Sequence, residues 1–343
     1  MLRASTLLWD KLSCERNALR NDDKEENVSV FGGRILLATD GSPEAERALG
    51  TAAMLSEKLG AELHLVCVEP MPDPLSWPEA RIMSPELRGD IRERAEDAAR
   101  EVLEGQAEKL GEMGVEASGI HAAAGPPDAE IVRLAEEVGA GLVVIGSRGL
   151  GPVRRAVMGG VSLSVVHHSH GSVLVVRGED GLPGRILLAV DGSEQARTAA
   201  EAAAEISAST GSNLHVVFVM PTAAHLYGHH LYSREMRESV REEAEDDVRA
   251  FLDEQVGWIE ARGGEVEDTH MAVGRPDAEI VKLAEKLGAG LTVVGSRGLG
   301  GVRRALVGSV SDSVVRHAHG PVLVVRGEGE GSHDASENMG TTG

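Results

Sequence analysis

The sequence is short of aromatic residues, of cysteine and of positive charge, and each shortage excludes a class of protein. Its 343 residues include only 3 Phe, 3 Trp and 2 Tyr, so the cores must consist of Val, Leu, Ile and Ala. The two cysteines, Cys14 and Cys67, exclude a disulfide-rich secreted scaffold and a cysteine-ligated zinc module. The formal net charge of -21 disfavours nucleic acid or an anionic membrane as the main partner, because both are bound through basic patches.

Long apolar runs are also missing. No run approaches the roughly 18 residues that a membrane-spanning helix requires. Near the N-terminus, Leu7-Leu8-Trp9 is ended at once by Asp10 and Lys11, which is too short for a secretory signal. We therefore expect a soluble cytoplasmic protein, and we expect Cys67 to be a buried core residue.

An internal repeat covers most of the chain. Residues 124–179 align without gaps on residues 273–328, and most aligned positions are identical. Upstream, RILLATDGS at 34–42 returns as RILLAVDGS at 185–193. Each unit has the length of a domain rather than of a solenoid repeat.

The repeat predicts two tandem domains, over 34–178 and 185–327, joined by a short linker rich in glycine and proline. The flanks 1–33 and 328–343 carry little hydrophobic periodicity and are expected to be disordered tails. A short linker should hold the two domains close together.

Within each unit, apolar runs alternate with helical segments. Ser42 is a good N-cap for a helix that ends near residue 59, and Pro127 suits the first turn of another. Buried apolar strands joined by helices predict two tandem, doubly wound, five-stranded parallel-sheet domains of the Rossmann-like α/β class. In the first copy the expected strands are 34–39, 63–68, 115–122, 142–145 and 173–176, and the later helices are 86–113, 127–138 and 160–169.

Ligands of such sheets bind at the carboxyl ends of the strands, close to the switch in strand order. A glycine-rich loop follows the fourth strand there, at 146–160 in the first copy and 295–309 in the second. Its glycines allow close backbone approach, and its last pair opens a helix whose free N–H groups attract an anion. The spacing Gly-x2-Gly-x9-Gly occurs in both copies, which favours a phosphate site over a plain strand-to-helix crossover.

The loop differs from the two best-known phosphate loops. No Gly-Lys-Ser/Thr follows it, so it lacks the lysine of a Walker A loop, and the Rossmann fingerprint follows the first strand rather than the fourth. An Asp-Gly-Ser after strand one combined with this loop after strand four resembles the universal stress protein family, over about 34–177 and 185–326. The chain looks like a tandem member, with a fold of the adenine-nucleotide alpha-hydrolase type.

The resemblance implies ATP binding, with Mg2+ as its companion ion. In the ATP-binding branch the strand-one aspartate and the residue that ends strand two contact adenine, while the glycine loop and the next helix hold ribose and phosphates. The residues so implied are Asp40, Val68, Gly146, Gly149, Gly159, Gly160, Val161 and Ser162 in the first copy, and Asp191, Val219, Gly295, Arg297, Gly298, Gly308, Ser309, Val310 and Ser311 in the second.

The first copy departs from this pattern at one position. Gly160 stands where the motif has Ser or Thr, so the backbone N–H remains but the hydroxyl is lost. A hydrogen bond to a charged group contributes about 1.5–3 kcal/mol, or roughly 10- to 100-fold in affinity. The second copy is therefore expected to bind nucleotide more tightly.

Several residues have plainer interpretations. Asp40 and Asp191 can serve as acids at a helix start, and the loop arginines can be solvated or interface charges instead of phosphate clamps. Histidines at helix C-termini are explained by the helix dipole, and no histidine group has the spacing of a zinc site, so no metal residue is predicted. These histidines are His167, His168, His170, His317 and His319 at helix ends, and His225, His229 and His230 in a loop.

Three functions remain open. The sequence favours a nucleotide-dependent regulatory module in the stress response, acting on an unknown protein partner. A slow Mg2+-dependent ATPase is the first alternative, although no lysine, catalytic glutamate or arginine finger stands at a recognised spacing. A nucleotide-free interaction scaffold is the second. The apolar fifth strands, 173–176 and 322–325, are expected to pair the two domains within the chain, and two chains to associate as a homodimer.

Overall fold

A computed structural model describes residues 29–71, 83–149, 158–178, 184–220, 234–298 and 307–327, with only the backbone described over 234–244. All statements below concern these residues. The expected tail 328–343 and most of the expected tail 1–33 lie outside them. Residues 29–33, however, form a turn, and the Phe31 side chain is fully buried. The packed structure therefore begins before residue 34.

The first repeat alternates strands and helices. Its elements are β1 (Arg34–Ala38), α2 (Pro43–Leu59), β2 (Glu62–Pro70), α3 (Pro85–Glu112), β3 (Gly119–Gly125), α4 (Pro127–Val138), β4 (Leu142–Gly146), α5 (Gly160–His168) and β5 (Ser172–Val176).

The second repeat follows the same order. Its elements are β6 (Arg185–Val190), α6 (Glu194–Thr210), β7 (Asn213–Met220), α8 (Arg234–Glu260), β8 (Glu265–Val273), α9 (Pro276–Leu287), β9 (Leu291–Gly295), α10 (Ser309–His317) and β10 (Val322–Val325).

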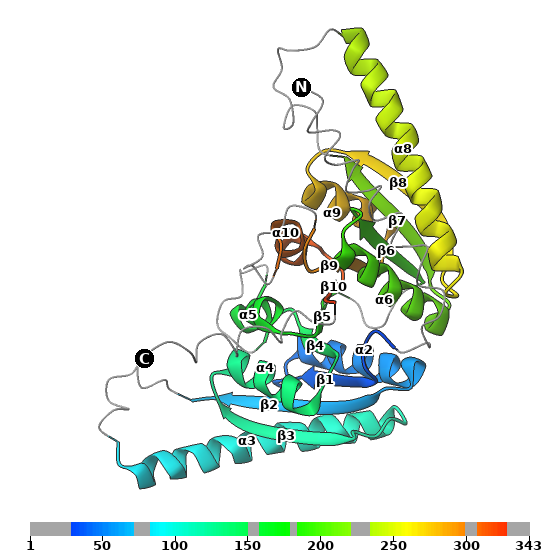
Figure 1. Cartoon of the computed structure of the whole chain (residues 1–343). Coiled ribbons are helices and arrows are strands. Elements are labelled where there is room, and N and C mark those ends of the chain that lie inside the picture. Colours follow the sequence, from blue (N-terminus) through cyan, green and yellow to red (C-terminus); the bar gives the residue numbers. More distant parts are fainter. Residues whose placement is uncertain are drawn as a thin grey trace, which may run out of the picture.

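All strands join one ten-stranded sheet in the order β3-β2-β1-β4-β5-β10-β9-β6-β7-β8 (Figure 1). Pairing is parallel within each repeat. The repeats meet where β5 and β10 pair antiparallel, with Leu174 opposite Leu323. This confirms the predicted doubly wound α/β class and the predicted pairing of the two fifth strands. The switch in strand order lies between β1 and β4, and between β6 and β9.

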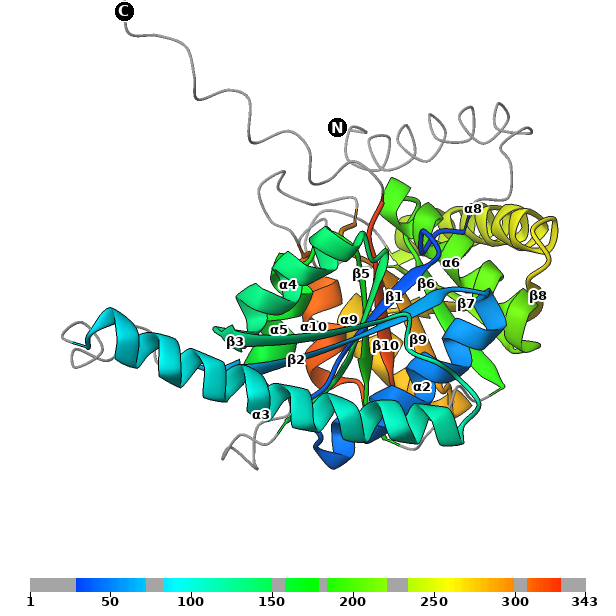
Figure 2. The same cartoon turned by 90° about the horizontal axis from the view of Figure 1, so that it is seen from below.

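Helices cover both faces of the sheet. One apolar core lies under α2, α3, α6 and α8, and the other lies under α4, α5, α9 and α10. Figure 2 shows the long helix α3 crossing β2 and β3 on the first of these faces. Cys67 packs in the first core, as predicted, and burial together with the charges of Glu69 and Asp40 raises the pKa of its thiol to about 12. Among the described residues no helix is both long and apolar enough to cross a membrane.

The helix that follows the first strand of each repeat has clear start and stop signals. Ser42 accepts a hydrogen bond from the Ala45 N–H at 3.2 Å, as the sequence predicted for this N-cap. The helix ends at Gly60, whose φ of 62° is the left-handed conformation that favours glycine. Ser193 and Gly211 play the same parts in the second repeat.

The third strand is displaced from its expected position. The apolar pattern predicted 115–122, but β3 begins at Gly119 and ends at Gly125. The chain first closes the end of α3, where the Val115 N–H donates to the Leu110 carbonyl at 3.0 Å. Val115 and Ala117 are apolar because they pack against the first core from this connection rather than from a strand.

Two buried arginines join the repeats. Arg177, just after β5, donates to the carbonyls of Val315 and Ala318 at the end of α10, both at 2.7 Å. Arg326, just after β10, donates to the Val166 carbonyl in α5 at 2.7 Å. Burial, with a smaller contribution from Arg148, lowers the pKa of Arg177 to about 10, so it stays charged at neutral pH. A cation at a helix C-terminus is favoured by the helix dipole.

Candidate functional site

The aspartates predicted to contact a ligand stand just beyond the carboxyl ends of β1 and β6. Asp40 Oδ1 accepts a hydrogen bond from the Ser42 N–H at 3.0 Å. Asp191 Oδ1 accepts from both the N–H and the hydroxyl of Ser193, at 3.0 and 2.6 Å. Each carboxylate therefore shapes the turn into the next helix, which is its plainer interpretation, while standing at the switch in strand order.

The glycine loop of each repeat lies directly against this aspartate. A Cβ atom added at Gly149 would collide with Asp40 Oδ2, and one added at Gly298 would collide with Asp191 Oδ2. The loop and the strand-one aspartate, far apart in sequence, are thus brought into contact. A side chain at the second glycine of the motif would displace this carboxylate from its position.

The first glycine of the motif has a packing role. A Cβ at Gly146 would lie 3.0 Å from the Glu44 carbonyl group, and one at Gly295 would lie 2.8 Å from that of Gln195. Glycine at these positions lets the first turn of α2 or α6 approach the end of β4 or β9. These two glycines position the site rather than line it.

Helices α5 and α10 begin at the same edge of the sheet. Their N-caps, Gly159 and Gly308, donate their N–H groups to the carbonyls of Ser147 and Ser296, at 2.8 and 2.7 Å. The first backbone hydrogen bond within α5 is donated by the Leu163 N–H, and that within α10 by the Asp312 N–H. Three N–H groups therefore precede it in each helix. They belong to Gly160, Val161 and Ser162 in α5, and to Ser309, Val310 and Ser311 in α10.

The two predicted serines of these helices are engaged inside the protein. The Ser162 hydroxyl donates to the Gly146 carbonyl at 2.7 Å, and the Ser311 hydroxyl donates to the Gly295 carbonyl at 2.6 Å. Both side chains are buried. They fix the helix start to the end of the fourth strand, and their hydroxyl hydrogens are already used.

The first helical residue distinguishes the repeats. Gly160 faces open space as far as the described residues go, since none of their heavy atoms lies within 4 Å of a Cβ placed there. Ser309, at the corresponding position, is exposed. The sequence difference therefore lies on the accessible side of the helix start, where a hydroxyl can reach a ligand.

The remaining predicted residues flank this edge. Val68 and Val219 are half-buried near the ends of β2 and β7 and pack on the core beneath α4 and α9. Arg297 is half-buried, and its carbonyl is 3.4 Å from the Ser193 hydroxyl. Residues 150–157 and 299–306, with the arginine pairs weighed as phosphate clamps, lie outside the described residues, as do His225, His229 and His230.

Sequence reasoning did not single out the serine that follows the fourth strand. Ser147 and Ser296 are both buried at the start of the glycine loop. The Ser296 hydroxyl has no hydrogen-bond partner among the described residues. Its signal was its place between two motif glycines, which the Gly-x2-Gly pattern treats as an arbitrary residue.

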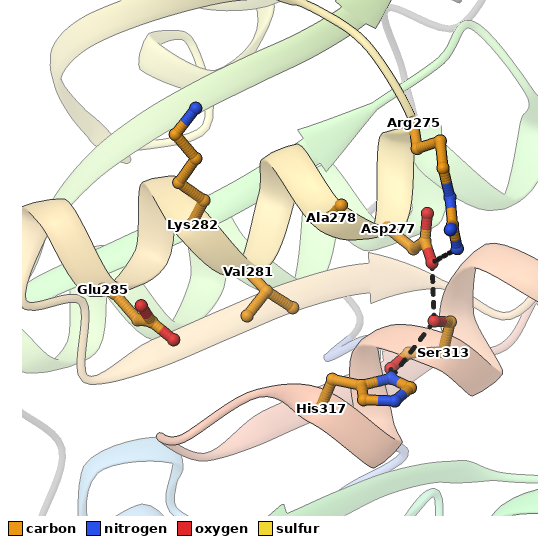
Figure 3. Close-up of a pocket in the computed structure, with 8 residues that line it drawn as sticks. All are labelled: Arg275, Asp277, Ala278, Val281, Lys282, Glu285, Ser313 and His317. Carbon is orange, nitrogen blue, oxygen red and sulfur yellow. Dashed lines mark hydrogen bonds and ion pairs between the residues drawn. The ribbon is translucent and has the colours of Figure 1, made fainter.

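A surface pocket lies between α9 and α10, apart from the glycine loop (Figure 3). In it the Ser313 hydroxyl donates to Asp277 Oδ2 at 2.7 Å, and His317 Nδ1 is 2.7 Å from the Ser313 carbonyl. A nucleophilic serine must give its proton to the histidine, whereas this hydroxyl is directed to the carboxylate. The cluster ties two helices together, and Asp128, Ser164 and His168 repeat it in the first copy.

The charges of this pocket are consistent with that structural role. Burial alone raises the pKa of Asp277, but hydrogen bonds from Ser313, Arg275 and the Ala278 backbone bring it below the ordinary value overall. The carboxylate is therefore ionised and fully engaged at neutral pH. His168 and His317 lie at the ends of α5 and α10, and each donates from Nδ1 to a carbonyl of its own helix.

The chain is similar to known proteins both in sequence and in structure. The model of the universal stress protein family matches residues 33–177 and 183–326. A universal stress protein of Mycolicibacterium smegmatis is 30% identical over 315 residues, covering 88% of this chain and 99% of the relative. The universal stress protein YxiE of Bacillus subtilis is 34% identical over 154 residues, covering 42% of this chain and 98% of the relative.

Solved structures give the same picture. The crystal structure of a universal stress protein from Archaeoglobus fulgidus aligns with a TM-score of 0.61 at 27% identity, covering 88% of this chain and 99% of that one. Both this structure and the mycobacterial relative span the two repeats.

Proposed function

Because this chain belongs to the universal stress protein family, we propose that it is an ATP-binding regulatory protein whose second repeat holds the tighter nucleotide site. The observation that carries the proposal is the pair of helix starts, at Gly160 and Ser309, placed beside an aspartate at the switch in strand order. Helix N-termini at this edge of a parallel sheet are favourable sites for phosphate groups.

The described residues fit a nucleotide phosphate in their donor chemistry. Three N–H groups at each helix start stand outside the helix hydrogen-bond pattern and attract an anion despite the chain's net charge of -21. In the second repeat Ser309 adds an exposed hydroxyl. The buried Ser296 hydroxyl has no hydrogen-bond partner among the described residues. Mg2+ bound with ATP would supply further positive charge at the phosphates.

The difference between the sites rests on one hydroxyl. The Ser309 hydroxyl can donate to a phosphate oxygen, whereas Gly160 offers only its backbone N–H. A hydrogen bond to a charged acceptor contributes about 1.5–3 kcal/mol, and the exposure of Ser309 places the effect near the lower figure, or about tenfold in affinity.

A regulatory output is supported by what lies at the other end of α10. The helix begins at Ser309, and at its other end the carbonyls of Val315 and Ala318 accept hydrogen bonds from Arg177 of the first repeat. A phosphate bound at the start of this short helix would therefore act on an element that belongs to the interface between repeats. We propose that nucleotide binding stabilises this interface and the surface that a protein partner, or a second copy of the chain, contacts.

Calorimetric titration of the full chain with ATP and Mg2+ tests the proposal. We expect one tighter and one weaker site, with Ser309→Gly weakening the tighter site by about tenfold. Gly160→Ser is the matched variant, because a Cβ atom at this position meets no atom of the described residues within 4 Å. It should strengthen the weaker site.

Phosphate release measured in the same samples separates binding from turnover. The proposal expects binding with little release. Absence of binding heat would contradict it, and so would an affinity that neither variant changes. Rapid release abolished by Ser309→Gly would replace the regulatory module with an ATPase.

A further inference from the structure

Each repeat carries a pair of histidines in contact between its second and third strands. Nδ1 of His64 lies 3.2 Å from Nε2 of His121, and Nδ1 of His215 lies 3.2 Å from Nε2 of His270. His215 is buried and His270 is half-buried. His215 lies two residues before Val217 on the same strand, and His270 lies opposite Val217 on the neighbouring strand. The Val217 side chain belongs to the core beneath α4 and α9.

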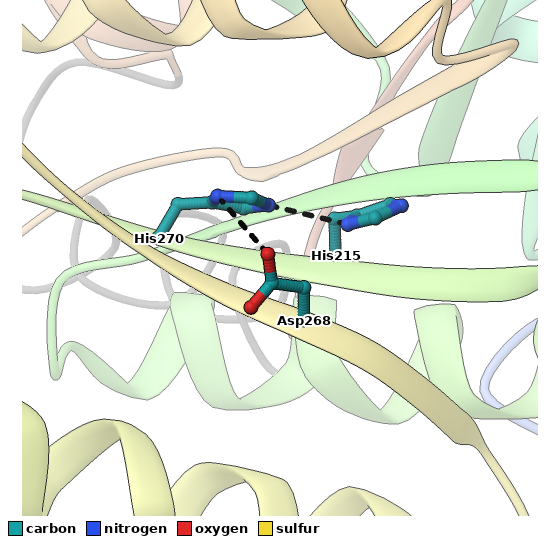
Figure 4. Close-up of side chains that lie close together, drawn as sticks. All are labelled: His215, Asp268 and His270. Carbon is teal, nitrogen blue, oxygen red and sulfur yellow. Dashed lines mark hydrogen bonds and ion pairs between the residues drawn. The ribbon is translucent and has the colours of Figure 1, made fainter.

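Among the residues that the structure describes, only the second repeat brings a carboxylate within 4.8 Å of both histidines of its pair. In the first repeat Glu62 lies 3.8 Å from the outer nitrogen, Nε2, of His64. Asp268 pairs with His215 in the sheet, and one ligand atom from each of Asp268, His215 and His270 lies within 4.8 Å of the other two (Figure 4). The residue that pairs with His64 in the first repeat is Gly119. Glycine offers no ligand at this position, and a Cβ atom there would require the His64 ring to move.

We propose that His215, His270 and Asp268 form a binding site for a divalent transition-metal ion of the zinc type, present in the second repeat alone. The proposal does not rest on the nucleotide site, which lies at the carboxyl ends of the strands. His215 precedes Val219 by four residues, or about 13 Å along β7 at the usual rise of a strand.

The geometry of the nitrogen pair suits such an ion. Zinc binds imidazole nitrogen at about 2.0–2.1 Å, so two nitrogens in tetrahedral coordination lie about 3.3 Å apart. The observed separation of 3.2 Å is close to this spacing. Two imidazoles and one carboxylate are ligands that zinc accepts together, with water in the fourth position, whereas Mg2+ prefers oxygen ligands alone.

Burial favours the neutral form of the His270 ring, which is the form that binds metal. Burial is the main reason that the pKa of His270 is lowered; Asp268 opposes this shift, and His215 and Lys286 add to it. Nε2 of His215 is buried without a hydrogen-bond partner among the described residues and lies 3.5 Å from Glu267. A carboxylate beside the outer nitrogen of a histidine ligand orients that ligand and raises its basicity.

The site would join two strands. His215 belongs to β7, while Asp268 and His270 belong to β8, the strand at the outer edge of the sheet. A bound ion would therefore fasten the edge strand of the second repeat to its neighbour. The first repeat would keep its histidine pair as an ordinary contact between β2 and β3.

The test uses the full chain without an affinity tag, titrated with Zn2+ by calorimetry and with Co2+ by absorption spectroscopy. We expect one Zn2+ per chain and the intense visible absorption of Co2+ in a tetrahedral site. Asp268→Asn, which keeps the size of the side chain, and His270→Asn should each weaken Zn2+ affinity at least about tenfold, since even outer-shell changes cost about 10- to 100-fold. His121→Asn, the matched change in the first repeat, should leave the affinity unchanged.

Two controls decide the other outcomes. Thermal melting without metal shows whether each variant folds, and Mg2+ should not compete. Zinc uptake that survives Asp268→Asn and His270→Asn, or that is lost with His225→Ala/His229→Ala/His230→Ala, would overturn the proposal. So would no uptake by a folded chain, or equal weakening by His121→Asn.

Discussion

Gly160 and Ser309 stand at the same point of the two repeats, as the first residue of the helix that follows the glycine loop. The backbone around them is alike: each N-cap glycine donates to the serine carbonyl after the fourth strand, and each helix is tied back by a buried serine. Two copies of one frame thus differ in an exposed hydroxyl. Packing and hydrogen bonds hold the same backbone at both helix starts, whereas the exposed first residue can differ without disturbing it.

The same contrast appears at the contact between repeats. Both fifth strands are followed by a buried arginine that reaches the opposite repeat. Beside this symmetric pair, His167 of α5 contacts Asp312 of α10 at 2.7 Å. The repeat places Arg316 where the first copy has His167, and Leu163 where the second copy has Asp312, so no second pair of this kind forms. Arg316 also bonds to Asp312. The interface is therefore symmetric in its backbone and one-sided in its charge.

The largest expected effect comes from removing the interface arginines one at a time. Arg177→Met deletes two bonds to helix carbonyls and leaves both carbonyls buried, so we expect a loss of about 3 kcal/mol in the free energy of unfolding. Arg326→Met removes the bond to the buried Val166 carbonyl and should cost a similar amount.

Urea unfolding followed by circular dichroism measures both variants. Because the arginines join the repeats, Arg177→Met should also separate the unfolding of the two halves into distinct steps. A single transition with unchanged midpoint would show that the strand pairing of β5 with β10 suffices to hold the repeats together.

A smaller effect is expected at the packing glycines. Gly295→Ala places a methyl group 2.8 Å from the Gln195 carbonyl group, and Gly146→Ala places one 3.0 Å from that of Glu44. Overpacking of this kind costs about 1–3 kcal/mol, and the closer contact should cost more. Thermal melting of the two variants measures the order; a greater loss for Gly146→Ala would reverse the comparison.

The sequence predicted the architecture well because the repeat supplied two independent copies of each signal. Apolar runs, Ser42 as an N-cap and the glycine pair before α5 all gave elements at or near their observed bounds. The third strand was displaced because Val115 and Ala117 are apolar for packing outside a strand, which periodicity alone does not separate.

The candidate site was predictable in its place but less so in its roles. Motif spacing brought Asp40 to the glycine loop correctly, yet it did not show that Gly146 serves helix packing or that Ser162 is bonded inward. Those roles depend on which atoms lie opposite across the fold. The histidine cluster was missed for the same reason, because His215 and His270 become neighbours only through the register of β7 and β8.

The smallest expected effect tests the one-sided charge at the interface. Burial alone raises the pKa of Asp312, but hydrogen bonds from Arg316 and His167 bring it below the ordinary value of 3.8 overall. Because the folded-state pKa is lowered, the carboxylate stabilises the fold above the unfolded pKa, and this contribution is lost as pH falls through the folded value. Asp312→Asn should therefore cost about 1 kcal/mol at pH 7 and almost nothing near pH 2.

Chemical unfolding of the wild type and of Asp312→Asn between pH 7 and pH 2 measures this difference. Asp246→Asn is the control, since Asp246 pairs with Arg249 on the exposed face of α8, where such a pair contributes little. A cost for Asp312→Asn that stays constant with pH would mean that the side chain acts through its size and dipole. A cost that vanishes in acid, with no change for Asp246→Asn, would mean that the ionised carboxylate acts through its bonds to Arg316 and to the histidine of the other repeat.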